Sequence, residues 1–230
     1  MDDPLMYVAL GDSITNGRNV RKKQRYPSIL TRWLAQSFHH PVYGRNWGKN
    51  GMSSSGFLNQ LQSPRVFETV RHAQFVTVCI GGNDLIYAYF KWRLWRNDTY
   101  LDEAVHTLAR NFHRICEQLH WLARGNVVFG TFYNPFPLTP LAVETVEFCN
   151  YGVIRPTAER YGFPVADLYA AFRGRESILL ENYRTGRLEE YRPLSRRSPV
   201  HPNVDGYSTI AHCFARELLK SSSHRNDGEP

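Results

Sequence analysis

Short apolar runs alternate along this chain with longer segments of helical periodicity. Leu5–Leu10 and Phe75–Ile80 are nearly continuous apolar runs that end at glycine, which is typical of strands buried on both faces of a sheet. Tyr26–Phe38 and Leu101–Ala123 place apolar side chains three and four residues apart, as helices with one buried face do. This alternation predicts an α/β fold in which helices cover both faces of a parallel sheet.

The remaining elements expected from the sequence are shorter. They are strands over 42–46, 126–132 and 165–168, and helices over 56–61, 141–161 and 204–219. Because there is no repeat and no linker, we expect a single domain over residues 1–220. Residues 221–230 contain no apolar side chain, so we expect a disordered tail there.

Composition excludes several classes of protein. Hydrophobic residues make up 42% of the 230 residues, which is enough for a packed core. No apolar run approaches the ~20 residues of a membrane helix, and the N-terminus lacks the pattern of a signal peptide, so we expect a cytoplasmic protein. The four cysteines form no C-x-x-C pair and are expected to be reduced and buried.

The net charge of +7 raises the question of an anionic partner. The basic residues fall into three groups, over 18–25, 91–96 and 184–197, all of which we expect to be loops. None of them matches a helix-turn-helix, a zinc finger or an RNA-binding sheet. Nucleic acid is therefore not the expected partner.

Small and polar residues follow three of the expected strands and precede the last helix. These clusters are Gly11–Gly17, Asn46–Ser53, Gly81–Asp84 and His201–Tyr207. In an open parallel sheet, ligands bind outside the carboxyl ends of the strands. The sequence therefore predicts that the functional site lies at this edge.

Two of these residues suit nucleophilic catalysis. Ser13 comes two residues after a buried strand, and its hydroxyl could attack a carbonyl if a base removed its proton. His201 is the best candidate base among nine histidines, because it lies in a turn marked by proline and glycine. The Ser13 N–H, the Gly51 N–H and the Asn83 side chain are candidate donors to an oxyanion. Each cluster alone is also ordinary turn or helix-cap chemistry, so the combination carries the prediction.

In this order, from Gly11 to Tyr207, the four clusters resemble the blocks of the SGNH hydrolase superfamily, the GDSL lipases and esterases. G-D-S-I-T-N-G resembles the nucleophile block, which implies that Ser13 attacks the ester. N-W-G-K-N-G-M-S-S and G-G-N-D resemble the blocks that imply Gly51 and Asn83 as oxyanion donors, and H-P-N-V-D-G-Y implies His201 as the base. The resemblance also implies a flavodoxin-like three-layer α/β/α sandwich with a parallel sheet of about five strands.

One position departs from the family pattern. The family usually carries aspartate three residues before the histidine, where this chain has Ser198. A triad carboxylate holds the imidazole and stabilises its protonated form. The favoured replacement is a backbone carbonyl just before His201. Glu189 or Glu190, the Ser198 hydroxyl, or a slow enzyme without any substitute are the alternatives.

The segment Tyr87–Arg96 follows soon after the Gly81–Asp84 cluster and is expected to overhang the site. Its mixture of aromatic side chains and cations suits contact with an acyl chain beside an anionic head group, or docking at a lipid surface. The structural alternative is a lid that packs on the domain. The residues expected to line the substrate pocket are Asp12, Tyr89, Trp92, Tyr133 and Phe136.

The expected function is therefore a serine esterase or lipase, without metal or other cofactor, that forms an acyl-enzyme on Ser13. A carbohydrate acetyl esterase of the same fold is the first alternative. The second is a catalytically weak module that binds anionic surfaces through its basic loops. The expected partners are a small-molecule or lipid ester and an anionic membrane or lipid surface.

Overall fold

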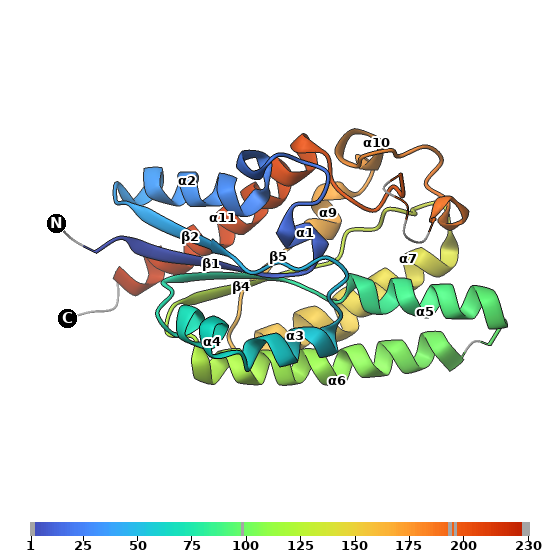
Figure 1. Cartoon of the computed structure of the whole chain (residues 1–230), viewed down its shortest axis with the longest axis horizontal. Coiled ribbons are helices and arrows are strands. Elements are labelled where there is room, and N and C mark those ends of the chain that lie inside the picture. The colour runs from blue at the N-terminus through green and yellow to red at the C-terminus, as the bar shows by residue number, and fades with distance from the viewer. Residues whose placement is uncertain (1–2, 98, 193–194, 196, 227–230) are drawn as a thin grey trace.

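Five parallel strands form the centre of the computed structural model, which describes residues 3–97, 99–192, 195 and 197–226, with the last six as backbone (Figure 1). The strands are β1 (Leu5–Gly11), β2 (Val42–Asn46), β3 (Phe75–Cys79), β4 (Asn126–Gly130) and β5 (Val165–Ala166). Their order, β2-β1-β3-β4-β5, is the flavodoxin-like order and confirms the expected fold class.

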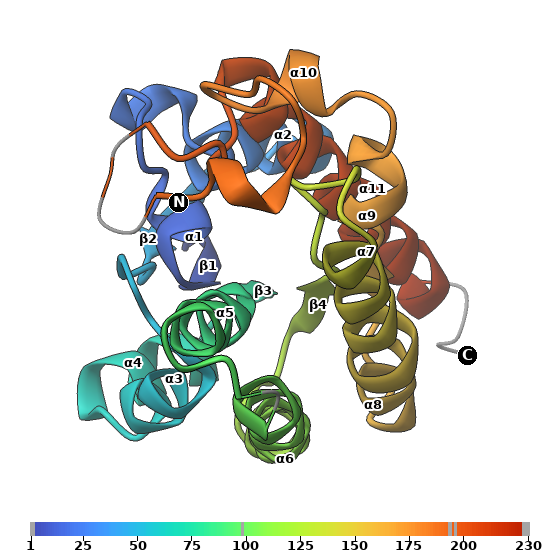
Figure 2. The same ribbon diagram turned by 90° about the vertical axis from the view of Figure 1, so that its right-hand side faces the viewer.

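Helices cover both faces of this sheet, as Figure 2 shows. On one face lie α2 (Tyr26–Phe38), α9 (Leu168–Phe172) and α11 (Val204–Asn226). On the other lie α3 (Ser54–Leu61), α4 (Pro64–Arg71), α6 (Thr99–Leu122), α7 (Pro140–Glu147) and α8 (Arg155–Arg160), the last two joined by the π-helical segment Phe148–Ile154. Each layer packs its own hydrophobic core against the sheet, so the three layers are stabilised by two separate cores.

The remaining elements gather beyond the carboxyl ends of the strands. They are α1 (Ser13–Asn16), α5 (Gly82–Trp95), α10 (Glu176–Leu179) and two 3₁₀ turns at Lys22–Gln24 and Leu188–Glu190. In Figure 1, α5 runs away from the sheet alongside α6. The loops, α1 and α5 thus surround the edge where the sequence predicted the site.

The structure corrects two expectations about irregular segments. The basic group at 91–96 was expected to be a loop, but Lys91–Trp95 form the end of α5. The sequence pattern did not predict this helix because its apolar side chains are not confined to one stripe. Part of the helix packs on α6, whereas several of its aromatic side chains reach solvent. The last helix continues to Asn226, through six residues expected to be disordered, and residues 227–230 lie outside the described residues.

Candidate active site

The nucleophile turn begins where β1 ends. Gly11 has a φ of 149°, and a Cβ atom there would lie 2.1 Å from the carbonyl oxygen of Cys79 on β3, so this position requires glycine. The next residue, Asp12, caps α1 by accepting a hydrogen bond of 2.9 Å from the Ile14 N–H. Ser13 is therefore the first residue of α1, and it lines a cavity at the sheet edge.

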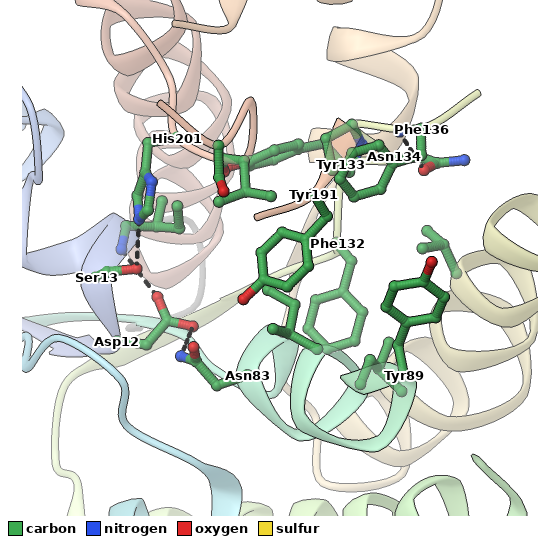
Figure 3. Close-up of a pocket in the computed structure, with 18 of the residues that line it drawn as sticks. Asp12, Ser13, Asn83, Tyr89, Phe132, Tyr133, Asn134, Phe136, Tyr191 and His201 are labelled. Carbon is green, nitrogen blue, oxygen red and sulfur yellow. Dashed lines mark hydrogen bonds between the residues drawn. The ribbon is translucent and has the colours of Figure 1, made fainter. Parts of the chain in front are cut away.

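His201 reaches the same cavity from the segment between α10 and α11. Its carbonyl accepts a hydrogen bond of 2.9 Å from the Glu181 N–H, and the Val200 carbonyl accepts one of 2.7 Å from the Tyr133 hydroxyl. The Nε2 atom of His201 lies 3.0 Å from the Oγ atom of Ser13 (Figure 3). Both side chains are buried, so the structure brings the predicted nucleophile and base into hydrogen-bond contact.

The side chains proposed to replace the missing aspartate do not orient His201. The Ser198 hydroxyl donates to the Arg192 carbonyl and accepts from the Arg192 N–H, so it closes its own loop. Glu190 accepts from the Thr185 N–H, and neither Glu189 nor Glu190 lines the cavity. Within the described residues, Ser13 Oγ is the one hydrogen-bond partner of the His201 ring. Orientation by a backbone carbonyl remains a prediction.

The electrostatic environment of His201 strongly favours the neutral ring. Burial, together with the positive charge of Arg18, lowers the pKa of His201 to about 4. The ring is therefore a free base at neutral pH and able to accept the Ser13 proton. The same environment would oppose the imidazolium form of the ring, since no carboxylate among the described residues balances its charge.

The residues of the three candidate oxyanion donors, Ser13, Gly51 and Asn83, all line this cavity. Asn83 lies at the start of α5, and its amide donates a bond of 2.9 Å to the Met52 carbonyl and a longer one of 3.4 Å to Asp12. Gly51 has a φ of 72° and lines the cavity. Neither the Gly51 N–H nor the Ser13 N–H has an acceptor within the part of the chain that the structure describes. Two backbone donors without an acceptor among the described residues, and one side-chain amide, thus belong to residues that line the cavity.

Hydrogen bonds hold the loop after β2 against the nucleophile turn. The Lys49 N–H donates to the Gly11 carbonyl (3.0 Å), and the Asn46 amide donates to the Thr15 carbonyl (2.7 Å). The Asn16 amide also donates to Asn50 Oδ1 at 3.0 Å. These bonds set the position of Gly51 relative to Ser13.

Asn83 is positioned by a polar network that was not predicted from the sequence. The neighbouring carboxylate of Asp84 accepts bonds from the Ser54 N–H (2.8 Å) and the Ser54 hydroxyl (2.6 Å). The Asn111 amide donates to Ser54 Oγ at 2.8 Å, so α3, α5 and α6 meet at this point. The available signal was the carboxylate next to Asn83 in the first turn of a helix, but recognising it required expecting α5.

Asp12 is an unusual carboxyl group at the base of the site. Burial, reinforced by the nearby Asp84, raises the pKa of Asp12 to about 7, although its bond from the Ile14 N–H opposes this rise. The ionised form is therefore costly in the folded protein. Asp12 lines the cavity as the sequence predicted.

The cavity has a volume of about 420 Å³ and two different ends. Figure 3 shows Ser13, His201, Asp12 and Asn83 together on one side and a group of aromatic side chains on the other. Further lining residues on the apolar side include Phe132, Phe136, Leu141, Ala142 and Val146. Such a cavity suits an ester whose acyl part is apolar.

Four of the five residues expected to line the pocket do so: Asp12, Tyr89, Tyr133 and Phe136. Trp92 does not. It stacks against Tyr89, with ring centroids 5.8 Å apart, and the guanidinium of Arg96 lies over its ring. Tyr89 and Trp92 are three residues apart on α5, so their rings can stack, and Tyr89 is the one of the two that lines the cavity.

Two further observations concern metal binding and membrane spanning. Over the described residues, no three histidine, cysteine, aspartate or glutamate side chains gather in a group that could hold a metal ion. The helices of this part of the chain are also too short or too polar to span a membrane.

Comparison with known proteins agrees with this geometry. Residues 9–208 match the model of the GDSL-like lipase/acylhydrolase family. The chain is 26% identical over 215 residues to the spore germination lipase LipC of Bacillus licheniformis, covering 90% of this chain and 93% of that protein.

Solved structures give the same result. The lipase Lip_vut3 from a goat rumen metagenome superposes with a TM-score of 0.76 at 25% identity, over 93% of this chain and 97% of that one. The acetylxylan esterase Axe2 of Geobacillus stearothermophilus has a TM-score of 0.67 at 18% identity, over 93% and 94% of the two chains, and shows the fold alone. The family match confirms the resemblance seen in the four sequence clusters, and the chain belongs to the GDSL-like lipase/acylhydrolase family and is an ester hydrolase.

Proposed function

We propose that the protein hydrolyses carboxylic esters through an acyl-enzyme on Ser13. The Ser13 Oγ atom attacks the ester carbonyl while Nε2 of His201 accepts its proton, and His201 then donates that proton to the leaving alcohol. A water molecule, deprotonated by His201, releases the acid in the second half. The observation that carries this proposal is the 3.0 Å contact between these two atoms.

The oxyanion of each tetrahedral intermediate accepts hydrogen bonds from the Ser13 N–H, the Gly51 N–H and the Asn83 amide. The first two donors have no other acceptor among the described residues. The Asn83 amide is held by the Met52 carbonyl and makes only a long contact of 3.4 Å with Asp12, so its second N–H is available to a better acceptor.

The apolar side of the cavity favours a medium or long acyl chain over acetate. An acetyl group would leave Phe132, Phe136 and Val146 without contact, whereas a longer chain would bury their surface. The structural similarity to an acetylxylan esterase keeps a carbohydrate acetyl esterase as the second candidate. A series of nitrophenyl esters of increasing chain length separates the two, since an acetyl esterase would be fastest on the shortest member.

Ser13→Ala tests the chemistry. We expect a loss of at least ~10³-fold in ester turnover while the thermal unfolding midpoint stays near that of the wild type. Ser37→Ala, at an exposed position on α2, is the matched control and should keep full activity. Unchanged turnover in Ser13→Ala would remove this serine from the mechanism.

We further propose that the end of α5 docks on an anionic lipid surface. Leu94 and Trp95 are 58% and 60% exposed, and they lie among the cations Lys91, Arg93 and Arg96. Apolar side chains beside basic side chains suit the boundary between lipid tails and anionic head groups. Cosedimentation with vesicles should require phosphatidylglycerol in addition to phosphatidylcholine, weaken with salt, and fall in Trp95→Asp; binding indifferent to lipid charge and to this variant would contradict the proposal.

A further inference from the structure

The position of the His201 ring depends on how its backbone is fixed, because no carboxylate holds it. Among the described residues the ring bonds to Ser13 alone, and the side chains of Ser198 and Glu190 are bonded elsewhere. A triad carboxylate keeps the imidazole in place and also stabilises its charge. In this protein another group has to supply the first of these two effects.

The chain from His201 onward is anchored to the end of α10. The Glu181 N–H donates to the His201 carbonyl at 2.9 Å, and the Asn203 N–H donates to the Leu179 carbonyl at the same distance. Both bonds act on the carboxyl side of the histidine. The residue before it is held from a different part of the fold.

That residue is Val200, and Tyr133 holds it. The Tyr133 hydroxyl donates a hydrogen bond of 2.7 Å to the Val200 carbonyl, across 67 positions of the chain. The Tyr133 ring stacks on Phe172 of α9, with ring centroids 4.4 Å apart and an angle of 15° between the planes. Because Phe172 is fully buried, this stack restricts the ring and directs its hydroxyl to the histidine segment. Burial raises the pKa of Tyr133 well above its ordinary value, so the hydroxyl stays a donor.

Tyr133 is itself anchored from the opposite helical layer. It follows Phe132, whose N–H donates to the side-chain oxygen of Asn150 and whose carbonyl accepts from the Asn150 amide, both at 2.8 Å. Asn150 is completely buried in the π-helical segment between α7 and α8. Its side chain therefore pairs both backbone groups of a buried residue just beyond the end of β4. A continuous set of contacts thus runs from the π-helical segment to the histidine.

We propose that Tyr133 is a positioning residue, which holds the imidazole of His201 at hydrogen-bond distance from Ser13. It acts through the Val200 carbonyl and supplies the positional part of what a triad carboxylate does. This inference rests on the proposed function, in which His201 is the base. Since the hydroxyl is bonded to Val200, its loss should reduce the fraction of molecules with an aligned pair and leave ester binding nearly unchanged.

The test is Tyr133→Phe, which removes this hydroxyl and keeps the ring and its stack. We expect kcat on a nitrophenyl ester to fall at least ~10-fold, with KM within about twofold of the wild type, because a misplaced base costs rate and not ground-state binding. Tyr169→Phe is the matched control. The Tyr169 hydroxyl donates to Glu147 at 2.7 Å, and the residue is buried but does not line the cavity. This control should keep the kcat of the wild type.

A second measurement observes the histidine directly. In the proposed mechanism Nε2 of His201 accepts from Ser13, so the proton of the neutral ring is on Nδ1. Nitrogen-15 NMR should show this one tautomer in the wild type and in Tyr169→Phe, and a mixture of the two tautomers in Tyr133→Phe. A kcat in Tyr133→Phe equal to that of the control, or an unchanged tautomer, would overturn the inference.

Ser13→Ala and His201→Gln report on the proposed function separately. If either variant keeps full turnover, the proposed function is wrong. If both lose turnover while Tyr133→Phe keeps a normal kcat, only the role of Tyr133 is removed.

Discussion

The Nε2 atom of His201 lies 3.0 Å from the Oγ atom of Ser13, although 188 residues separate them in the chain. Ser13 starts α1 at the end of β1, and His201 precedes α11, which packs on the opposite side of the nucleophile turn from α5. The pair forms without a carboxylate three residues before the histidine, and this absence determines much of the expected behaviour of the enzyme.

The acid side of the pH profile should be shifted to low pH. In the proposed mechanism the neutral ring of His201 is the active form. Burial and Arg18 lower its pKa to about 4, so kcat/KM should fall only as the pH approaches that value. Because the folded pKa lies below the unfolded one, the associated stability is present above about pH 6.5 and is lost as the pH falls toward 4. In Arg18→Gln the midpoint should rise. An acid limb centred between pH 6 and 7 in the wild type would contradict this environment for His201.

Restoring aspartate by Ser198→Asp should give no gain in kcat. Ser198 is buried and its hydroxyl is bonded to the backbone of Arg192, so a carboxylate there would face the Arg192 carbonyl instead of the His201 ring. We expect an unchanged or lower rate and a loss of about 1–3 kcal/mol in unfolding free energy. Steady-state kinetics and urea unfolding measure the two effects. A large gain in rate would show that the missing carboxylate limits catalysis.

Asp12→Asn should stabilise the fold, and more so at high pH. The folded pKa of Asp12 is raised to about 7, so the stability that its protonated form contributes is lost as the pH rises through that value. Asparagine also caps helices and can still accept from the Ile14 N–H. The gain in unfolding free energy should be on the order of 1–3 kcal/mol larger at about pH 8 than at about pH 5. A gain independent of pH would show that Asp12 is ionised normally.

Asp84→Ala should lower kcat without removing a catalytic residue. It leaves the Ser54 N–H and hydroxyl without their acceptor and frees the start of α5, which carries Asn83. We expect a loss of about 1–3 kcal/mol in stability and a fall in kcat larger than the rise in KM, because the oxyanion contact exists mainly in the transition state. Asp84→Asn should recover part of both, and Glu103→Ala, exposed on α6, should change neither. If Asp84→Ala loses stability but its kcat equals that of the control Glu103→Ala, Asp84 is a structural residue only.

Filling the apolar end of the cavity should shorten the preferred acyl chain. Ala142 lines the cavity from α7, so Ala142→Trp should reduce turnover of long nitrophenyl esters at least ~10-fold while the acetate ester is still hydrolysed. Glu144→Trp places the same side chain on an exposed position of α7 and serves as the control. If all chain lengths lose rate equally, the acyl chain does not occupy this end.

Much of this architecture was predictable from local pattern. The bounds of α2 and β2 match those expected from sequence, and the starts of β3 and β4 do also, because buried strands and one-sided helices have clear periodicities. The four polar clusters were assigned to one edge because parallel strands end on the same side. By contrast, the helix α5 was not predicted from the sequence. Its side chains face the cavity, α6 and solvent in turn, so they give no single apolar stripe.

The sequence by itself determined the fold class, the family and the identity of Ser13, Gly51, Asn83 and His201 as candidates, since these depend on local order along the chain. Only the tertiary structure decided which side chains meet. It placed Arg18 rather than a carboxylate near His201, turned Ser198 to the Arg192 backbone, joined Asp84 to Ser54 and moved Trp92 behind Tyr89. The first and third of these outcomes join segments that are distant in sequence, and the second and fourth depend on how the loop at Ser198 and the helix α5 pack in the fold. Periodicity carries no information about such packing.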